Sequence, residues 1–232
     1  MTITITPVTG IGEVVPGDDV AAVILEALET SGIGVEDGDV IVITHKIVSK
    51  AEGRIADVAD DAAYRRLAED EAAAVVRRRG DLVITITRHG FICANAGVDR
   101  SNVEHGKAVM LPIDPDRSAH RVRTRIEHAT GRRIAVVVSD TFGRPWRRGL
   151  TDVAIGVSGM TAIEDLRGTT DTFGRVLDVT EVAVVDEIAA AADLVMGKAT
   201  STPAAVIRGL EWSPGDGRAT DLVRPAGEDM FR

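Results

Sequence analysis

Short apolar runs rich in valine and isoleucine, each closed by polar residues, limit the fold of this chain more than any other feature. The clearest are Val40–Thr44, Ile134–Ser139 and Ala204–Arg208, and each predicts a buried β-strand. Aromatic residues make up only 3% of the sequence. Valine, isoleucine, leucine and alanine must therefore fill the core, which favours sheets with short helices packed on them. The sequence predicts an α+β fold.

Four segments have the apolar spacing or the composition of helices. Asp18 or Asp19 can cap the first, because an aspartate accepts hydrogen bonds from the free N–H groups of a first turn. The second is rich in Ala and Arg and would lie on the surface, the third is basic and amphipathic, and the fourth is apolar enough to be well buried. The four are predicted at about 20–31, 60–79, 118–130 and 180–195.

Further strands follow from alternating or continuous apolar patterns at 2–7, 81–87, 90–94, 107–112 and 152–156. The first of these is predicted to be an edge strand, and the middle three are close enough in sequence to form an antiparallel sheet. No low-complexity linker divides the chain. We therefore expect one domain over residues 1–232, with a sheet-rich lobe inserted at about 80–180.

The composition excludes several classes of function. A net charge of −9 argues against general binding to nucleic acid or to anionic membranes, since both need an excess of Lys and Arg. Cys93 is the single cysteine, so a disulfide framework and a cysteine-based zinc site within one chain are excluded. No basic leader and no apolar run of about 18 residues is present. These observations predict a cytoplasmic enzyme or binding protein.

Two aspartates stand at the ends of apolar runs and are followed at once by small polar residues. They are Asp99, before Arg-Ser-Asn, and Asp140, before Thr141. Such oxygens can hold a hydrated divalent cation for phosphate chemistry. The alternative is that each aspartate stabilises a turn or caps a helix, and the residues alone leave both interpretations open.

Several cationic and amide side chains lie close to these aspartates in sequence. Arg144 and Arg147 could bind phosphate or carboxylate oxygens through their guanidinium groups, and they are candidates for substrate binding. Lys50, which we expect at the end of a strand, could reach a phosphate or simply be solvated. Asn102 could ligate a base or a phosphate, or stabilise a turn. The buried-strand end at His45 favours a hydrogen-bonded structural histidine.

Standard nucleotide motifs are absent. Gly197-Lys198 has Ala192 where a phosphate-binding Walker loop needs its first glycine, and Ala199 follows the lysine. Gly10 and Gly12 do not have the spacing of a dinucleotide-binding turn. The small polar segment Met196–Pro203 could still wrap phosphates with backbone N–H groups, or it could be a helix end and a loop.

Several long motifs in their order along the chain resemble the coenzyme F(420)-0 gamma-glutamyl ligase family. The motifs are Pro7–Val14, Pro16–Asp19, Asp37–Arg54, Ala96–Asn102, Ser139–Arg147, Gly149–Gly156 and Glu181–Arg208. The resemblance implies a two-lobed fold of mixed and antiparallel sheets with flanking helices that forms an intertwined homodimer. Some members carry a further flavin-dependent domain after the ligase; since this chain ends at Arg232, we expect that activity to be absent.

The resemblance also implies an activity. It is a GTP-dependent, GDP-forming ligase that adds L-glutamate through gamma-linked amides to the deazaflavin coenzyme precursor F(420)-0, by way of an acyl phosphate. Two divalent cations, magnesium or manganese, are implied as cofactors, and a monovalent cation such as potassium is a further candidate. The general base stays unknown.

The resemblance transfers site residues position by position. The implied metal ligands are Asp99, Asp140 and Thr141. The implied nucleotide-binding residues are Ile11, Gly12, Glu13, Val14, His45, Lys50, Asn102, Met196, Gly197, Lys198, Ala199, Thr200, Ser201, Thr202 and Pro203. Two rival functions use the same residues: a metal-dependent phosphohydrolase with water as acceptor, and a non-catalytic module that binds nucleotide or deazaflavin.

Overall fold

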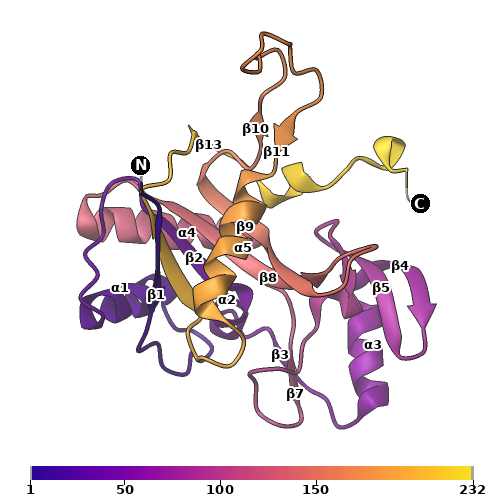
Figure 1. Ribbon diagram of the computed structural model, residues 1–232. Coiled ribbons are helices and arrows are strands. Elements are labelled where there is room, and N and C mark those ends of the chain that lie inside the picture. Colours follow the sequence, from indigo (N-terminus) through magenta and orange to yellow (C-terminus); the bar gives the residue numbers. More distant parts are fainter. Residues whose placement is uncertain (1, 231–232) are drawn as a thin grey trace.

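The central sheet of the computed structural model has six strands in the order β1-β12-β2-β8-β9-β13, and Figure 1 shows it in the middle of the molecule. The structure describes residues 2–230. The strands of this sheet are β1 (Thr4–Val8), β2 (Val40–Thr44), β8 (Ala135–Gly143), β9 (Leu150–Met160), β12 (Ala204–Arg208) and β13 (Pro214–Gly215). β2 and β8 are parallel, and the other neighbours are antiparallel. The sheet is therefore mixed.

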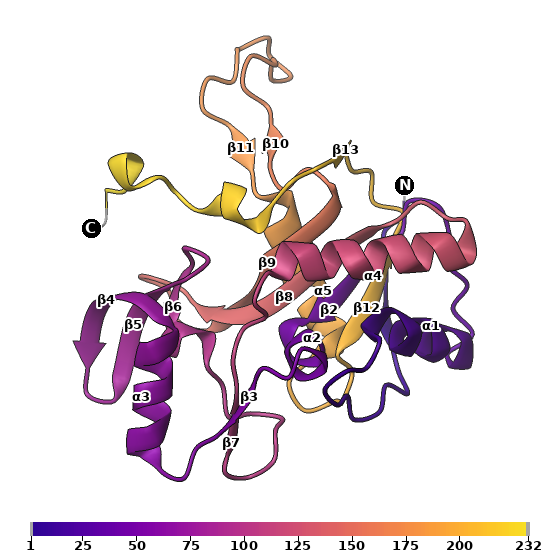
Figure 2. The ribbon, with the colours of Figure 1, turned by 180° about the vertical axis from the view of Figure 1, so that it is seen from behind.

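Helices cover both faces of this sheet. α5 (Val184–Met196) lies on one face (Figure 1), and α4 (Pro115–Thr130) and α1 (Val20–Thr30) lie on the other, which Figure 2 shows from behind. The apolar residues of β2, β8 and β12 are buried between these layers. Strands covered on both faces are continuously apolar rather than alternating. The predicted buried strands are confirmed, and so is the predicted edge position of β1.

A smaller lobe lies beside the sheet and has its own apolar cluster. It consists of α3 (Asp61–Glu71) and a three-stranded antiparallel sheet of β4 (Ala72–Arg79), β5 (Leu82–Thr87) and β6 (Ile92–Ala94), followed by the short helix η1 (Asn95–Gly97). A two-stranded pair, β3 (Ile55–Asp57) and β7 (Lys107–Val109), joins the lobe to the rest. The cluster contains Val58, Ala68, Val98, Ala108 and Met110.

Two predicted elements are wrong in type. The helix expected at 60–79 ends at Glu71, and the second half is strand β4, because pairing with β5 overrides the helix propensity of its Ala and Arg residues. The segment after β2 is not a strand end but a helix, α2 (His45–Ala51), so Lys50 lies in a last helical turn. The strand predicted at 107–112 forms, as β7, but pairs with β3 rather than with the lobe sheet.

β8 and β9 fall within 80–180 but belong to the central sheet, whereas α3 and β4 precede residue 80. The division at about 80–180 stays a prediction.

The last part of the chain forms an arm and a covering segment. A long arm projects from the molecule between β10 (Glu164–Asp165) and β11 (Glu181–Val182), as Figure 1 shows. After β13, the last strand, the chain crosses the surface with two short helical turns, η2 (Ala219–Leu222) and η3 (Ala226–Glu228). Trp212 packs on the core and donates its indole N–H to the carbonyl of Gly38 at 2.9 Å. None of the helices between residues 2 and 230 is long and apolar enough to cross a membrane.

Candidate functional site

The register of β2 and β8 brings two of the predicted site residues together. Thr44, the last residue of β2, pairs with Ser139 in the parallel ladder. Because parallel strands run to the same edge of a sheet, the next residues along the two strands, His45 and Asp140, are neighbours. The Nε2 atom of His45 lies 3.3 Å from Oδ1 of Asp140.

His45 is buried and has one ring nitrogen without a hydrogen-bond partner. Its Nδ1 lies 3.3 Å from the hydroxyl of Ser49, one turn later in α2. Nε2 makes no hydrogen bond to any residue between 2 and 230, since its contact with Asp140 has the distance of an ion pair without the geometry of a hydrogen bond. Buried polar atoms are nearly always paired in folded proteins. This nitrogen and the carboxylate beside it therefore point to a bound ligand.

Thr141 and Asp152 face each other across the antiparallel pair of β8 and β9. Thr141 donates its hydroxyl to Oδ1 of Asp152 at 2.5 Å, and Ser139 donates its hydroxyl to Oδ2 at 2.9 Å. The Asp152 side chain is only 2% exposed, so these donors replace the water that the carboxylate has lost. With its proton directed at Asp152, the Thr141 oxygen presents lone pairs to a cation.

The segment Met196–Pro203, which links α5 to β12, reaches the same group. Lys198 donates from Nζ to the hydroxyl oxygen of Thr141 and lies 3.0 Å from Oδ1 of Asp152. At the end of the segment, the N–H of Thr44 donates to the carbonyl of Pro203 at 2.9 Å. Both ends of this loop are thus attached to the strand ends that carry the site.

Asp99 stands on the other side of the start of α2. It exchanges backbone hydrogen bonds with Val109. Its carboxylate accepts from the backbone N–H of Ser101 at 2.8 Å and from the Ser101 hydroxyl at 2.6 Å, and Lys46 lies 2.6 Å away. Burial raises the pKa of Asp99, but the hydrogen bonds from Lys46 and Ser101 lower it by more, so this pKa lies below its usual value.

These contacts close into a circuit that we call the site ring. Asp99 contacts Lys46, the neighbouring His45 contacts Asp140, and Thr141 contacts Lys198. The side-chain amide of Asn102 closes it by donating to the Lys198 carbonyl at 3.5 Å. The members of the site ring are Lys46, His45, Asp99, Asn102, Asp140, Thr141 and Lys198.

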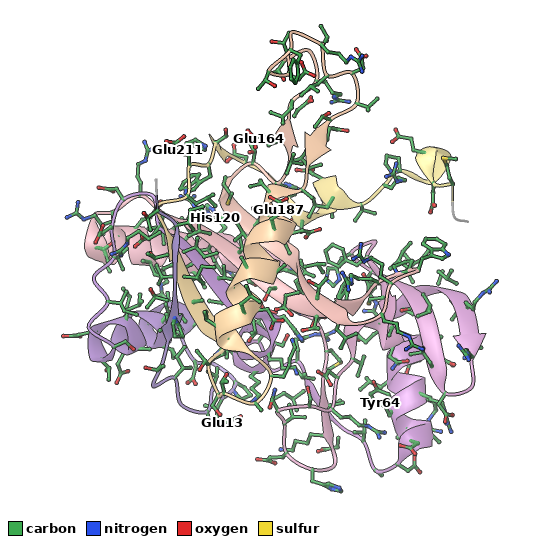
Figure 3. All side chains as sticks on the ribbon, in the orientation of Figure 1. Glu13, Tyr64, His120, Glu164, Glu187 and Glu211 are labelled. Atoms are coloured by element: carbon green, nitrogen blue, oxygen red, sulfur yellow. The ribbon has the colours of Figure 1, made fainter. Side chains whose placement is uncertain are left out.

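Lys50 and Glu13 lie next to the site ring. Lys50 is buried in the last turn of α2, and its Nζ lies 2.6 Å from Oε1 of Glu13. The Glu13 side chain is exposed, so a ligand phosphate can replace it at the ammonium with little cost. Figure 3 shows Glu13 at the same end of the central sheet as the loop after α5.

Two backbone segments face this end of the sheet with unpaired donors. Among the hydrogen bonds of residues 2–230, none has the N–H of residues 11–14 or 198–202 as its donor. Consecutive free N–H groups are a common means of binding phosphate oxygens. Both segments belong to the predicted nucleotide-binding residues.

The residues of the site ring fit a divalent cation bound together with a phosphate ligand. Among the four carboxylates here, Glu13, Asp99 and Asp152 each have a lysine partner, whereas within the described chain Asp140 has none. No group of three or more His, Cys, Asp or Glu residues in the described part of the chain is arranged to hold a metal ion. Magnesium needs no such cage, because it keeps several waters and is completed by substrate phosphates. Asp140, with Asp99 and Thr141 nearby, is therefore the residue best suited to bind a divalent cation.

The two predicted substrate-binding arginines are not part of the site ring. Arg144 and Arg147 lie in the exposed turn between β8 and β9. Arg144 donates to the carbonyls of Arg148 at 2.7 Å and Gly149 at 3.5 Å, within its own turn. Their role in substrate binding stays a prediction.

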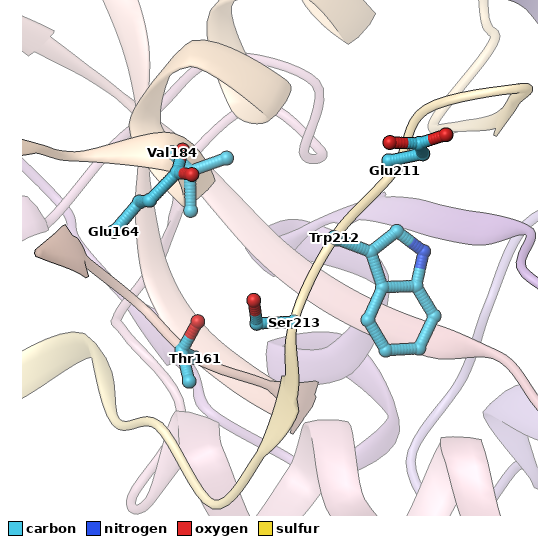
Figure 4. A pocket seen from close by; sticks show the side chains of 6 residues that line it. All are labelled: Thr161, Glu164, Val184, Glu211, Trp212 and Ser213. Carbon is cyan, nitrogen blue, oxygen red and sulfur yellow. The ribbon is translucent and has the colours of Figure 1, made fainter. Parts of the chain in front are cut away.

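A cavity of about 280 Å³ lies elsewhere, and Figure 4 shows it. Its lining includes Val184, the first residue of α5, whereas the site ring lies at the other end of that helix, near Met196. The 13 residues of α5 separate the two by about 20 Å. The charged groups that converge are at the site ring and not at this cavity. The lining residues are Thr161, Glu164, Val184, Glu211, Trp212 and Ser213.

Lys46, Asp152 and Ser101 were not predicted as site residues. The sequence did contain a signal for Asp152. It begins a predicted apolar strand, and a carboxylate that is buried with such a strand needs hydrogen-bond partners. Lys46 carried no such signal, since nothing in the sequence distinguishes it from a solvated lysine.

Comparisons with known proteins identify the family of the chain. A family model described as F420-0:Gamma-glutamyl ligase matches residues 10–209. Three similar proteins are each named Coenzyme F420:L-glutamate ligase. The protein from Methanothermobacter thermautotrophicus is 44% identical over the full length of both chains, and that from Methanopyrus kandleri is 41% identical over 100% of this chain and 98% of its own. The protein from Methanocaldococcus jannaschii is 43% identical over 85% of this chain and 86% of its own.

Proposed function

Because the chain belongs to the F420-0:gamma-glutamyl ligase family, we propose that it joins L-glutamate to the deazaflavin coenzyme precursor F420-0 through gamma-linked amides, with GTP converted to GDP and phosphate. The observation that carries the proposal is the site ring, in which two lysines and a carboxylate without a lysine partner lie together, with two segments that have free N–H groups at the same end of the sheet.

The proposed role of the loops and lysines is to hold the nucleotide. The free N–H groups of residues 11–14 and 198–202 would donate to phosphate oxygens. Lys50 would exchange its exposed partner Glu13 for a phosphate, and Asn102 is placed to contact the nucleotide beside the loop. Arg144 and Arg147, on the turn between β8 and β9, are proposed to bind the carboxylates of the substrates.

One divalent cation, magnesium or manganese, would be held by Asp140 together with Asp99. Bound there, it would neutralise charge on the transferred phosphoryl group and align the reacting oxygens. His45 would fix the orientation of the Asp140 carboxylate from the buried side. The Asp152 carboxylate would hold the Thr141 hydroxyl in place.

The chemistry requires activation of a carboxylate. A carboxylate is a poor acyl donor, so the proposed sequence transfers the γ-phosphoryl group of GTP to the carboxylate of the precursor. The amine of glutamate then attacks the acyl phosphate, and phosphate leaves with the oxygen that joined it to the acyl carbon. The chain needs no covalent nucleophile for this sequence, and its contribution is binding, orientation and charge.

Mass spectrometry of F420-0 after incubation with the full chain, GTP, manganese and L-glutamate tests the proposal. We expect stepwise gain of glutamyl residues that disappears when either GTP or glutamate is omitted. GTP hydrolysis without any mass gain would instead support a phosphohydrolase. Binding of the precursor or of the nucleotide with neither reaction would support a non-catalytic module.

We also propose that the protein acts as a homodimer. In the smaller lobe, β4 is exposed along nearly its whole length, and its outer edge has no strand partner among the described residues. Exposed Val75, Val76 and Leu82 lie on this hairpin. Unprotected apolar edge strands tend to pair with another chain. A mass close to twice that of the chain in light scattering after gel filtration is the expected result, and a monomer at micromolar concentration would contradict it.

A further inference from the structure

The ammonium of Lys198 lies where a second divalent cation would be expected. Its Nζ donates to the Thr141 hydroxyl oxygen and lies 3.0 Å from Oδ1 of Asp152 and 3.6 Å from Oδ1 of Asp193. Hydroxyl and carboxylate oxygens are the ligands that magnesium and manganese prefer. A positive group of the chain itself thus occupies an oxygen-lined position beside the proposed metal ligand Thr141.

Lys46 makes a similar contact with Asp99, but the two lysines differ in how easily they can leave. The Asp99 side chain is 41% exposed, so water can solvate this carboxylate when Lys46 moves away. The Asp152 side chain is 2% exposed. Lys198 is its single charged partner among the described residues, and removing one member of a buried pair leaves an uncompensated charge. Lys198 is therefore held in place, whereas Lys46 can be displaced.

A divalent cation at Thr141 would have to overcome two further obstacles. Lys198 already donates to the oxygen that the cation would use. The cation would also share these oxygens with the positive ammonium, and two positive charges so close together in a partly buried site repel strongly. Asp140 meets neither obstacle, because none of the lysines in residues 2–230 forms an ion pair with it.

We propose that the ammonium of Lys198 is the resident cation at Thr141 and Asp152, so that each chain binds one divalent cation, at Asp140, in place of two. Lys198 supplies the second positive charge, and its contacts attach the loop Met196–Pro203 to the site. This inference rests on the proposed function only in placing a divalent cation at Asp140. It replaces the expectation of two metal ions with one metal ion and one tethered ammonium.

Counting bound manganese tests the inference without any measurement of activity. Equilibrium dialysis of the full chain against manganese alone should give one tight ion per chain for the wild type. Lys198→Met removes the ammonium and leaves the Asp152 carboxylate without a counter-charge, so this variant should bind two. Electron paramagnetic resonance should then show coupling between neighbouring manganese ions in Lys198→Met and an isolated ion in the wild type.

Lys107→Met is the matched control, because Lys107 forms an exposed ion pair with Glu104 at 2.8 Å. It should bind one ion, like the wild type. Lys198→Arg keeps the charge and should also bind one. Should Lys198→Met fail to fold, Lys198→Gln replaces it, and the wild-type count still decides the question. Zero or two ions in the wild type would overturn the inference, as would one ion in a folded variant without the ammonium.

The result is separable from the outcome for the ligase. Two manganese ions in a wild-type protein that glutamylates F420-0 would overturn only the role of Lys198. One ion in a protein without ligase activity would leave the role of Lys198 supported and would overturn the proposed reaction.

Discussion

His45, the residue that follows β2, and Asp140 of the parallel strand β8 are brought together by the register of the two strands, and their side chains meet at 3.3 Å at the carboxyl end of β2. The sequence separates the two residues widely, and only the pairing of β2 with β8 makes them neighbours. The unpaired Nε2 of His45 and the absence of an ion pair between Asp140 and any lysine in the described chain suit this carboxylate to the proposed cation.

Asp140→Asn should reduce glutamate addition at least about 100-fold, because the amide cannot supply the negative charge that a bound cation needs. The melting temperature should stay close to that of the wild type, since Asp140 is only part-buried and in strand β8. Asp57→Asn, an exposed aspartate at the end of β3, is the control. Near-wild-type turnover in Asp140→Asn would refute its assignment as a metal ligand.

Asp152→Asn should loosen the loop after α5. The single amide oxygen can accept from only one of the two hydroxyls of Ser139 and Thr141, and the neutral side chain no longer attracts Lys198. We expect a loss of about 1–3 kcal/mol in the free energy of unfolding and faster amide hydrogen exchange at Gly197 and Thr44, whose N–H groups donate to the carbonyls of Asp193 and Pro203 at the two ends of the loop. The double variant with Lys198→Gln should lose less than the sum of the single effects, because the two residues are partners. Full additivity would show that they act independently.

The pairing of Lys46 with Asp99 predicts a pH dependence of stability. The folded-state pKa of Asp99 is lowered, so the pair stabilises the protein above the unfolded-state value of about 3.9. That contribution is lost as the pH falls through the lower folded-state pKa. The difference in unfolding free energy between wild type and Lys46→Met should therefore be present near neutral pH and should shrink in acid. A difference that does not change with pH would mean that Lys46 acts by packing alone.

Cys93 should be unreactive in the folded protein. Burial, with a smaller contribution from the negative charge of Asp140, raises the pKa of its thiol to about 12. The reactive thiolate is then roughly 1,000-fold scarcer at pH 8 than for an exposed cysteine. Iodoacetamide should label the native chain very slowly and the urea-unfolded chain rapidly. Equal labelling rates would contradict the buried position of Cys93 in β6.

Gly156→Ala should destabilise the contact between α4 and β9. A Cβ at Gly156 would lie 2.5 Å from the carbonyl oxygen of Pro115, so the helix or the strand would have to shift. The expected loss is about 1–3 kcal/mol in the free energy of unfolding. Gly143→Ala is the matched control on the same sheet, because no atom lies within 4 Å of its Cβ position. Equal denaturant midpoints for the two variants would show that the contact is not tight.

The strands of the core could be predicted because their apolar runs have a simple cause: β2, β8 and β12 are covered on both faces. The capped helix α1 could also be predicted, and Asp19 does accept from the N–H of Ala21 at 3.2 Å. Strand β4 could not, since its Ala and Arg residues favour helix and only pairing with β5 makes them extended.

The site was predictable to the extent that its aspartates follow apolar runs, although in the structure β8 continues past Asp140 to Gly143 and Asp99 lies beyond β6 and η1. Asp140 and Asp99 were found in this way, but their partners depend on contacts between distant segments. Lys46 reaches Asp99 across 53 residues of sequence, and Lys198 reaches Asp152 across 46. Local patterns carry no information on such pairs, because a lysine that neutralises a carboxylate has the same sequence signature as one in water.

The most direct test of the proposed reaction follows the carboxylate oxygen of the substrate. F420-0 labelled with oxygen-18 in its carboxylate is incubated with the full chain, GTP, manganese and L-glutamate, and both products are analysed by mass spectrometry. The account predicts a glutamylated product and released phosphate that carries one labelled oxygen. Unlabelled phosphate from hydrolysed GTP, with F420-0 unchanged, would contradict it.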